Sequence, residues 1–134
     1  MKERILSTIE GRCNQMDKLM EDYKKSMESD FMSFFKNDCK ETYKTAYISR
    51  VLKKMKESVE EENDMQEILC KLKNERDFYL TKLTTQELYP QTTNQMYNLA
   101  LMVEMNAAQY LYKFYSVLLT SLRKTGKDKA KAEK

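Results

Sequence analysis

The stretch Leu72-Lys73-Asn74-Glu75-Arg76-Asp77-Phe78-Tyr79-Leu80-Thr81-Lys82-Leu83 closes a long heptad pattern and comes shortly before Pro90, the only proline of the chain. It places two adjacent aromatic residues at the end of a helix, just ahead of a turn. A second apolar helix that follows such a turn can pack back on those rings. We therefore predict an all-α fold: long heptad-patterned helices of coiled-coil type, with a C-terminal helix packing back to form a helical bundle.

Working outward from this stretch, apolar residues recur at heptad positions a and d from Leu6 to Leu83 without an insertion. A heptad phase that is maintained over this length is typical of left-handed coiled-coil packing. In an isolated surface helix, the apolar stripe would drift around the helix axis. One continuous helix over this span would be roughly 115 Å long.

Polar residues interrupt the a and d positions in two places. They are Asp30, Asn37, Glu41 and Lys44 in the first, and Ser58 and Glu62 in the second. Asn37-Asp38 can end one helix and cap the next, and Asn63 or Asp64 can cap another. Two arrangements therefore stay open: a rod, with or without a hinge near residue 38, and a bundle of three shorter helices over roughly 3–36, 39–61 and 64–88.

After the heptad pattern, the sequence contains a polar turn and then a strongly apolar segment. Pro90 and the polar residues that follow it predict the main turn, over residues 90–94, and Thr93 or Asn94 is expected to cap a helix over 95–122. That helix is apolar on most of its faces, which is typical of a buried helix. One neighbouring helix of the same chain cannot cover it, so we expect self-association or docking into a larger assembly.

The predicted organisation is a heptad helix over 1–37, a second heptad segment over 38–89, the turn, the apolar helix, and a basic tail over 123–134 that we expect to lack regular structure. The tail carries six basic residues: Arg123, Lys124, Lys127, Lys129, Lys131 and Lys134. It is either a solubilising end or a contact for phosphates, an acidic membrane surface or an acidic polymer. No aromatic residue is interleaved with the lysines, so nucleic acid is not an expected partner.

The residue inventory argues against catalysis and against a cofactor. The chain contains no histidine, its three cysteines are too far apart for a metal-ligand pair, and its only glycines are Gly11 and Gly126. We therefore expect no enzyme, no cofactor and no metal site. No apolar run is long enough to span a membrane, and the odd cysteine count without a secretory leader predicts reduced thiols in the cytoplasm or the nucleus.

The opening stretch also resembles a known family. Ten residues follow the pattern L-x-x-E-R-D-F-Y-F-x-K-L-R-x-I-E-L: Leu72, Glu75, Arg76, Asp77, Phe78, Tyr79, Lys82, Leu83, Glu87 and Leu88. The pattern is similar to the C-terminal dimerisation domain of the end-binding proteins, which track microtubule plus ends. The resemblance implies a parallel dimer closed as a four-helix bundle, with a groove for short Ser-x-Ile-Pro-type peptides. Leu80, Thr84 and Gln86 depart from the pattern, and these changes bear on peptide recognition more than on dimerisation.

We therefore interpret the chain as a non-enzymatic dimerisation and protein-interaction module, with an adaptor of end-binding type on microtubules as the narrower hypothesis. Its partner would be a second copy, another helical subunit, or tubulin and plus-end factors, in the cytoskeletal cytoplasm or the nucleus. The alternative is an obligate helical subunit of a kinetochore, ciliary, replication or tethering complex. The candidate dimer-core or partner-binding residues are Leu72, Arg76, Phe78, Tyr79, Leu83 and Glu87.

Overall fold

The chain folds into helices that pack against one another, as the sequence predicts. The computed structural model describes residues 1–85 and 92–132, with side chains as far as Arg123. Its helices are α1 (Lys2–Ser29), α2 (Phe31–Asn37), α3 (Cys39–Glu61), α4 (Met65–Thr84) and α5 (Gln95–Ala132).

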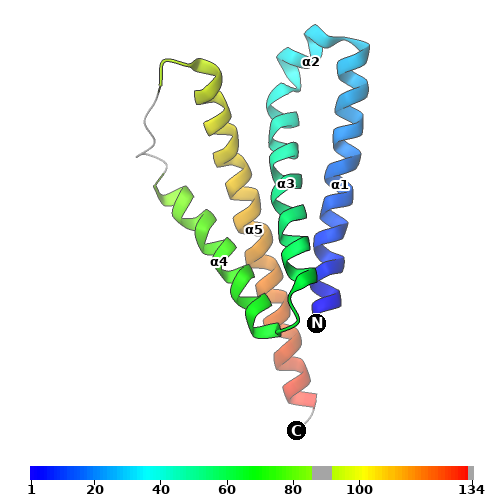
Figure 1. Cartoon of the computed structure of the whole chain (residues 1–134), viewed down its shortest axis with the longest axis vertical. Coiled ribbons are helices and arrows are strands. Elements are labelled where there is room, and N and C mark those ends of the chain that lie inside the picture. Colours follow the sequence, from blue (N-terminus) through cyan, green and yellow to red (C-terminus); the bar gives the residue numbers. More distant parts are fainter. Residues whose placement is uncertain (86–91, 133–134) are drawn as a thin grey trace.

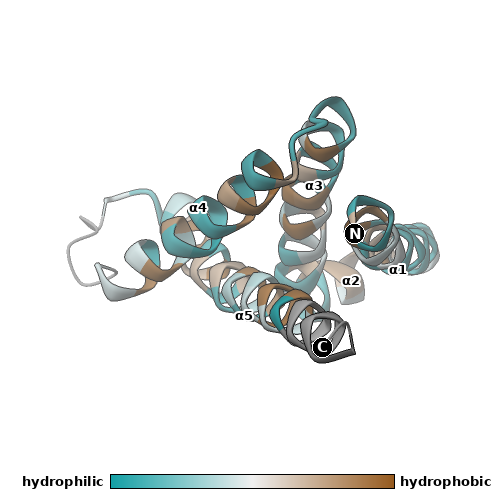
Figure 2. Cartoon of the chain, turned by 90° about the horizontal axis from the view of Figure 1, so that it is seen from below, coloured by the Kyte–Doolittle hydropathy of each residue, from teal (hydrophilic) through white to brown (hydrophobic). Residues whose placement is uncertain are grey.

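Two helical hairpins make up the bundle (Figure 1). In one, α1 and α3 lie side by side, with α2 as the bend between them; in the other, α5 packs back along α4. Contacts between α3 and α5 join the hairpins, and the view along the axis shows these two helices between α1 and α4 (Figure 2). Met1 and the end of α5 lie at one end of the molecule, and α2 lies at the other.

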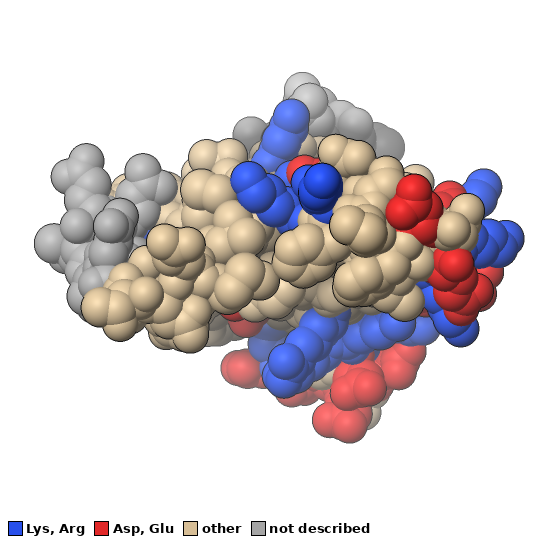
Figure 3. Space-filling model, turned by 90° about the horizontal axis from the view of Figure 1, so that it is seen from above, with Lys and Arg blue, Asp and Glu red and all other residues tan. Residues whose placement is uncertain are grey.

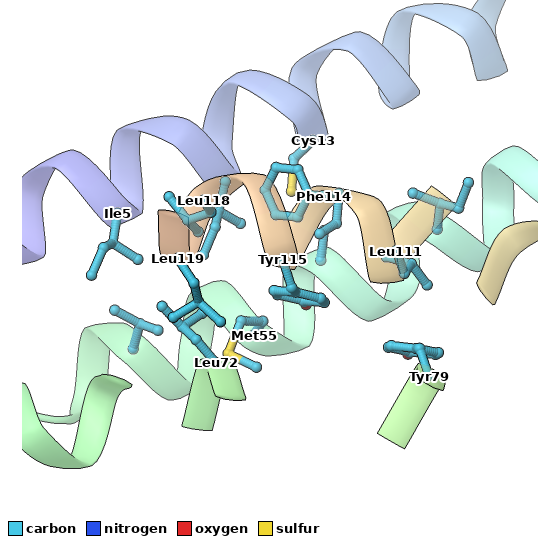
Figure 4. Close-up of a cluster of buried hydrophobic side chains, with 14 of the residues drawn as sticks. Ile5, Cys13, Met55, Leu72, Tyr79, Leu111, Phe114, Tyr115, Leu118 and Leu119 are labelled. Carbon is cyan, nitrogen blue, oxygen red and sulfur yellow. The ribbon is translucent and has the colours of Figure 1, made fainter. Parts of the chain in front are cut away.

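The core follows from the apolar stripe that each helix carries. In α1 the buried residues are Ile5, Ile9, Cys13 and Met16, three or four positions apart, which is one face of a helix. They meet the buried residues of the other long helices, among them Leu52, Leu72 and Tyr115 (Figure 4). A fully buried side chain of this size contributes about 1.5–3 kcal/mol through burial, so this core is the main source of stability.

Polar contacts along the outside fix how α1 lies against α3. Lys53 pairs with Asp17 at 2.8 Å between Nζ and Oδ1, and Lys56 lies 3.8 Å from Glu10. Nearer the N-terminus, Lys2 donates a hydrogen bond to the carbonyl oxygen of Glu60. As residue numbers decrease along α1, the numbers of their partners in α3 increase, so the two helices are antiparallel.

The continuous rod, one of the two arrangements that the heptad pattern left open, is not what forms. The helices are interrupted at Asp30, at Asp38 and between Glu62 and Asp64. Asp30 and Glu62 are polar residues at heptad positions, and both adopt extended backbone conformations. A carboxylate in a seam is costly to bury, so α1 and α3 end at these positions and the chain changes direction. The heptad phase survives because each short helix also needs one apolar stripe.

The predicted caps can be compared with the structure directly. Asp64 caps α4 by accepting a hydrogen bond from the Gln66 N–H at 2.9 Å, and Asn94 accepts from the Tyr97 N–H at 3.1 Å ahead of α5. Residues 86–91 lie outside the described part of the chain, and Pro90 with the start of the predicted turn falls among them.

The last helix is longer than predicted. It runs to Ala132, ten residues past the expected end at Leu122, and so includes most of the segment that we expected to lack regular structure. Lysine and alanine are good helix formers, and Gly126 alone does not end a helix. The faces of α5 are covered by helices of the same chain more fully than expected, because α3 and α4 both pack on it.

Candidate protein-interaction site

The motif that carries the family resemblance divides between the core and the surface. Leu72 is fully buried, Tyr79 is 3% exposed, and Leu83 packs against the core from a partly buried position. All three side chains therefore face other helices of the same chain. Leu72 and Tyr79 are therefore not available to a separate partner.

Tyr79 meets the returning helix, as the predicted fold requires. Its ring lies parallel to that of Tyr115 in α5, with centroids 6.4 Å apart, and Figure 4 shows the two rings approaching from α4 and α5. Phe114 adds an edge contact to Tyr115 at 5.3 Å. Burial raises the pKa of both tyrosines well above the usual value, so they stay neutral. This aromatic cluster joins the C-terminal half of α4 to α5.

Other motif residues are on the surface. Phe78 is 56% exposed, although its ring touches that of Tyr79 edge-on at 5.1 Å. Arg76 occupies heptad position a of the pattern that begins at Leu6. Its guanidinium pairs with the neighbouring Asp77 at 3.1 Å, so the charge reaches toward solvent instead of into a seam. Glu87 lies outside the described residues. Of the basic tail, Arg123 is exposed on α5, and the side chains of Lys124, Lys127, Lys129, Lys131 and Lys134 are outside the description.

A partly buried carboxylate lies beside the aromatic cluster. Glu75 and Tyr79 line a hollow between α3 and α4, and burial raises the pKa of Glu75. Lys71 lines the same hollow, but it pairs with Glu62 and donates a hydrogen bond to the Ser58 carbonyl. The hollow thus combines one partly buried acid with two lysines, Lys54 and Lys71. Structural networks of charged side chains also shift pKa values in this way.

The most prominent surface feature is at the end of the molecule where α2 lies. Phe31, Met32 and Phe35 are 59%, 71% and 50% exposed, and Met96 and Tyr97 at the start of α5 are 57% and 53% exposed. We call these five residues the apolar end. Both groups lie at the same end of the bundle in Figure 1. A view onto that end shows residues other than Lys, Arg, Asp and Glu over much of the face, with a group of basic residues among them (Figure 3).

Local hydrogen bonds hold α2 in this outward position. Asp30 accepts from the Ser33 N–H at 3.2 Å, and the Asp38 carboxylate accepts from the Ser26 hydroxyl at 3.3 Å. Phe34 points inward and is 8% exposed, so it anchors α2 while Phe31 and Phe35 face out. The rings of Phe31 and Phe35 lie 6.1 Å apart. The exposed apolar residues therefore sit on a fixed helix.

Sequence reasoning missed the apolar end. The heptad pattern assigns the run Phe31-Met32-Ser33-Phe34-Phe35 to a seam, in which only Phe34 occupies an a or d position. A signal was available: four large apolar residues within five positions, between Asp30 and Asn37, cannot all face one side of a short helix. Some of them had to be exposed.

Metal-binding groups and membrane-spanning helices can be checked over the described residues. Among them, no group of three or more Cys, Asp or Glu side chains is arranged to hold a metal ion. None of the helices searched over the described part of the chain has the length and apolar character needed to cross a membrane. Comparison of the chain with models of protein families, with curated proteins and with solved structures gives no match.

Proposed function

We propose that the chain is a non-enzymatic protein-interaction module that binds a protein partner through its apolar end. One observation carries the proposal: five large apolar side chains are exposed at the same end of the bundle, three of them on the capped helix α2. Scattered exposed apolar residues are ordinary on a protein surface, but a concentrated group marks a contact site.

The chemistry of the apolar end fits a protein contact. Phenylalanine, tyrosine and methionine are enriched in protein interfaces, where buried aromatic anchors supply much of the binding energy. Because Asp30 and Asp38 fix α2 before binding, little conformational entropy would be lost when a partner covers it. A rigid helix carrying Phe31 and Phe35 is thus suited to insertion into a partner's groove.

An adaptor of end-binding type is the narrower form of this proposal. Its support is the motif in α4 and the order of elements, in which α5 returns along α4 and meets Tyr79. Phe78 and Leu80 remain on the surface next to it, 56% and 41% exposed, where a peptide could contact them. In this form the partners are tubulin or plus-end factors, in the cytoplasm or the nucleus.

An obligate subunit of a larger helical complex is the second candidate. It is favoured by Met102, which is 49% exposed on α5 and extends the apolar surface away from its end. A larger covered area is typical of permanent complexes. This candidate predicts that the chain is poorly soluble alone and recovers on co-expression with its partner.

Site-specific photo-cross-linking tests the proposal. Benzoylphenylalanine is placed at Phe35 or at Tyr97 in the full chain, produced in the cells that naturally make it. We expect a discrete adduct from each position after irradiation, and both adducts to contain the same partner. An adduct of two copies would identify dimerisation, and an adduct with another polypeptide would identify an adaptor or a subunit.

The matched control is Glu57, which is exposed on α3 near the opposite end of that helix. The same photoreactive residue at Glu57 should give no discrete adduct. Replacing Phe31 and Met32 by serine should also abolish the adduct from Tyr97, without unfolding the bundle, because both side chains are exposed. Equal adducts from Glu57 and Phe35, or none from either apolar-end position, would rule the apolar end out as the contact site.

A further inference from the structure

The end of the bundle that carries α2 also contains a groove with apolar walls. The groove lies between the second half of α1, the helix α2 and the start of α3, and its volume is about 390 Å³. We call it the hairpin groove. Its uncharged lining consists of Met20, Tyr23, Met27, Phe34 and Thr42, and the exposed residues Glu21 and Lys24 form its charged rim.

The hairpin groove continues the apolar stripe of α1. In the first half of this helix, the residues at heptad positions a and d are buried, as far as Met16. Further along, the stripe is only partly covered: Met20 and Tyr23 are half-buried, and Met27 is 37% exposed. Apolar surface of this kind is stabilised when another apolar group covers it. A contact in the groove would therefore complete a stripe that the chain itself leaves open.

The size of the groove limits what can occupy it. Pockets for small molecules have volumes of roughly 300–1,000 Å³, and the hairpin groove is near the lower limit of this range. It can take one or two large side chains, but it is too small for a whole helix. The expected occupant is thus a pair of apolar side chains that project from a rigid surface.

Helix α2 presents such a pair of side chains. Phe31 and Phe35 are 59% and 50% exposed, and their ring centroids lie 6.1 Å apart on the capped helix. They do not fill the groove of their own chain, because Phe34 of the same helix already forms part of its wall. A second copy of the chain carries both the matching side chains and the matching groove.

The charges around the two surfaces are also complementary. The rim of the groove carries one acid and one base, Glu21 and Lys24. Asp30 and Lys36 flank the aromatic pair of α2 in the sequence, so this surface too carries one charge of each sign. None of Glu21, Lys24 and Lys36 forms an ion pair with another described residue. Two copies can therefore place Glu21 against Lys36 and Lys24 against Asp30.

Symmetry decides how many copies take part. If Phe31 and Phe35 of one copy enter the groove of another, a two-fold axis makes the second copy do the same to the first. Such an isologous contact uses both surfaces of both chains and closes at two copies. A one-way contact would instead leave a free groove and a free aromatic pair at the ends, and the assembly would grow.

We propose that two copies of the chain pair reciprocally, with Phe31 and Phe35 of each copy in the hairpin groove of the other. A half-exposed phenylalanine offers roughly 100 Å², so the whole contact covers on the order of 1,000 Å², which is near the lower limit for a specific interface. The dimer should therefore be weak, with a Kd of roughly 10–100 µM. The inference rests on the proposed function and names a second copy as the partner at the apolar end.

Sedimentation equilibrium of the full chain, at concentrations from well below to well above this Kd, is the first test. We expect a reversible change from monomer to dimer and no larger species. Phe35→Ser should weaken the dimer at least tenfold, because it removes one of the two inserted rings. Circular dichroism should show an unchanged fold, since the ring is half in solvent.

A charge exchange tests whether the contact is reciprocal. In Glu21→Lys, two lysines face each other at both ends of the dimer, and in Lys36→Glu two glutamates do. Each variant alone should dimerise about tenfold more weakly at low salt. When the two variants are mixed, every lysine faces a glutamate again, so a mixed dimer should form about as tightly as the unchanged chain pairs with itself.

The control is a second pair of charge changes at exposed positions, Glu57→Lys on α3 and Lys73→Glu on α4. These variants should dimerise within about twofold of the unchanged chain, alone or mixed. A chain that stays monomeric throughout, species larger than a dimer, an unchanged dimer in Phe35→Ser, or no recovery in the mixture would each overturn the proposal. If the chain is monomeric while photo-cross-linking at Phe35 captures another polypeptide, the reciprocal dimer fails and the proposed function stands.

Discussion

At the residue scale, neighbouring side chains of one motif have opposite environments. Phe78 and Tyr79 are adjacent aromatic residues, yet one is 56% exposed and the other 3% exposed. Adjacent positions of a helix point about 100° apart, so only one of them can face α5. The family pattern predicted that both matter, and the packing shows that Tyr79 belongs to the fold whereas Phe78 is open to a partner.

Replacing Tyr79 by alanine should therefore destabilise the chain by about 3–5 kcal/mol, as is typical of large-to-small changes at buried aromatic positions. The loss includes the stacking contact with Tyr115 and the edge contact with Phe78. Urea unfolding followed by circular dichroism measures the change. Phe78→Ala is the control, and it should cost no more than about 0.5 kcal/mol because the ring is largely in solvent. Equal losses in the two variants would contradict the assignment of Tyr79 to the core.

At the element scale, hydrophobic periodicity predicted where helices form better than where they end. The stripes of α1, α3 and α4 were visible in the heptad pattern, and the caps at Asp64 and Asn94 could be read from residue type. The break at Asp30 was harder to predict, because an aspartate at one heptad position is also tolerated in a continuous coiled coil. The cost of burying the Asp30 carboxylate favours an end to α1 there, but the return of α3 along α1 is a tertiary arrangement that residue type alone does not predict.

Gly11 gives a test of how α1 is stabilised. A Cβ atom built at Gly11 meets nothing within 4 Å, and the residue is exposed within a helix. Glycine costs about 0.5–1 kcal/mol relative to alanine at such a position, because its backbone loses more freedom on folding. Gly11→Ala should raise the free energy of unfolding by about that amount, measured by urea denaturation. The reverse change at an exposed position of the same helix, Lys18→Gly, should lower it. A destabilising Gly11→Ala would mean that the backbone there is strained or covered.

At the scale of the whole molecule, the all-α class and the returning last helix could be predicted from the sequence, but not how many chains form the bundle. A stripe at positions a and d is needed whether its partner helix belongs to the same chain or to another. Cys13 illustrates the ambiguity: it occupies a seam position, and the seam closes within one chain. The apolar end was also beyond the heptad pattern, because only the tertiary packing places the start of α5 at the same end of the bundle as α2.

The folded-back arrangement makes a prediction about thiol chemistry. Cys13 is 4% exposed, and burial raises the pKa of its thiol, whereas Cys70 is exposed on α4. A chain with Cys13 as its only cysteine should stay free of disulfide-linked dimer under mild oxidant and should react with a thiol reagent only on unfolding. A chain with only Cys70 should react quickly while folded. Rapid dimer formation through Cys13 in the native chain would show instead that two copies pair along α1.

The position of the chain ends has a practical consequence. Met1 and the end of α5 emerge together, at the pole away from α2 (Figure 1). A purification tag, a fluorescent protein or a surface linker joined to either terminus would leave the apolar end facing away from the attachment point. Immobilised by its termini, the chain would present Phe31 and Phe35 uniformly to the solution.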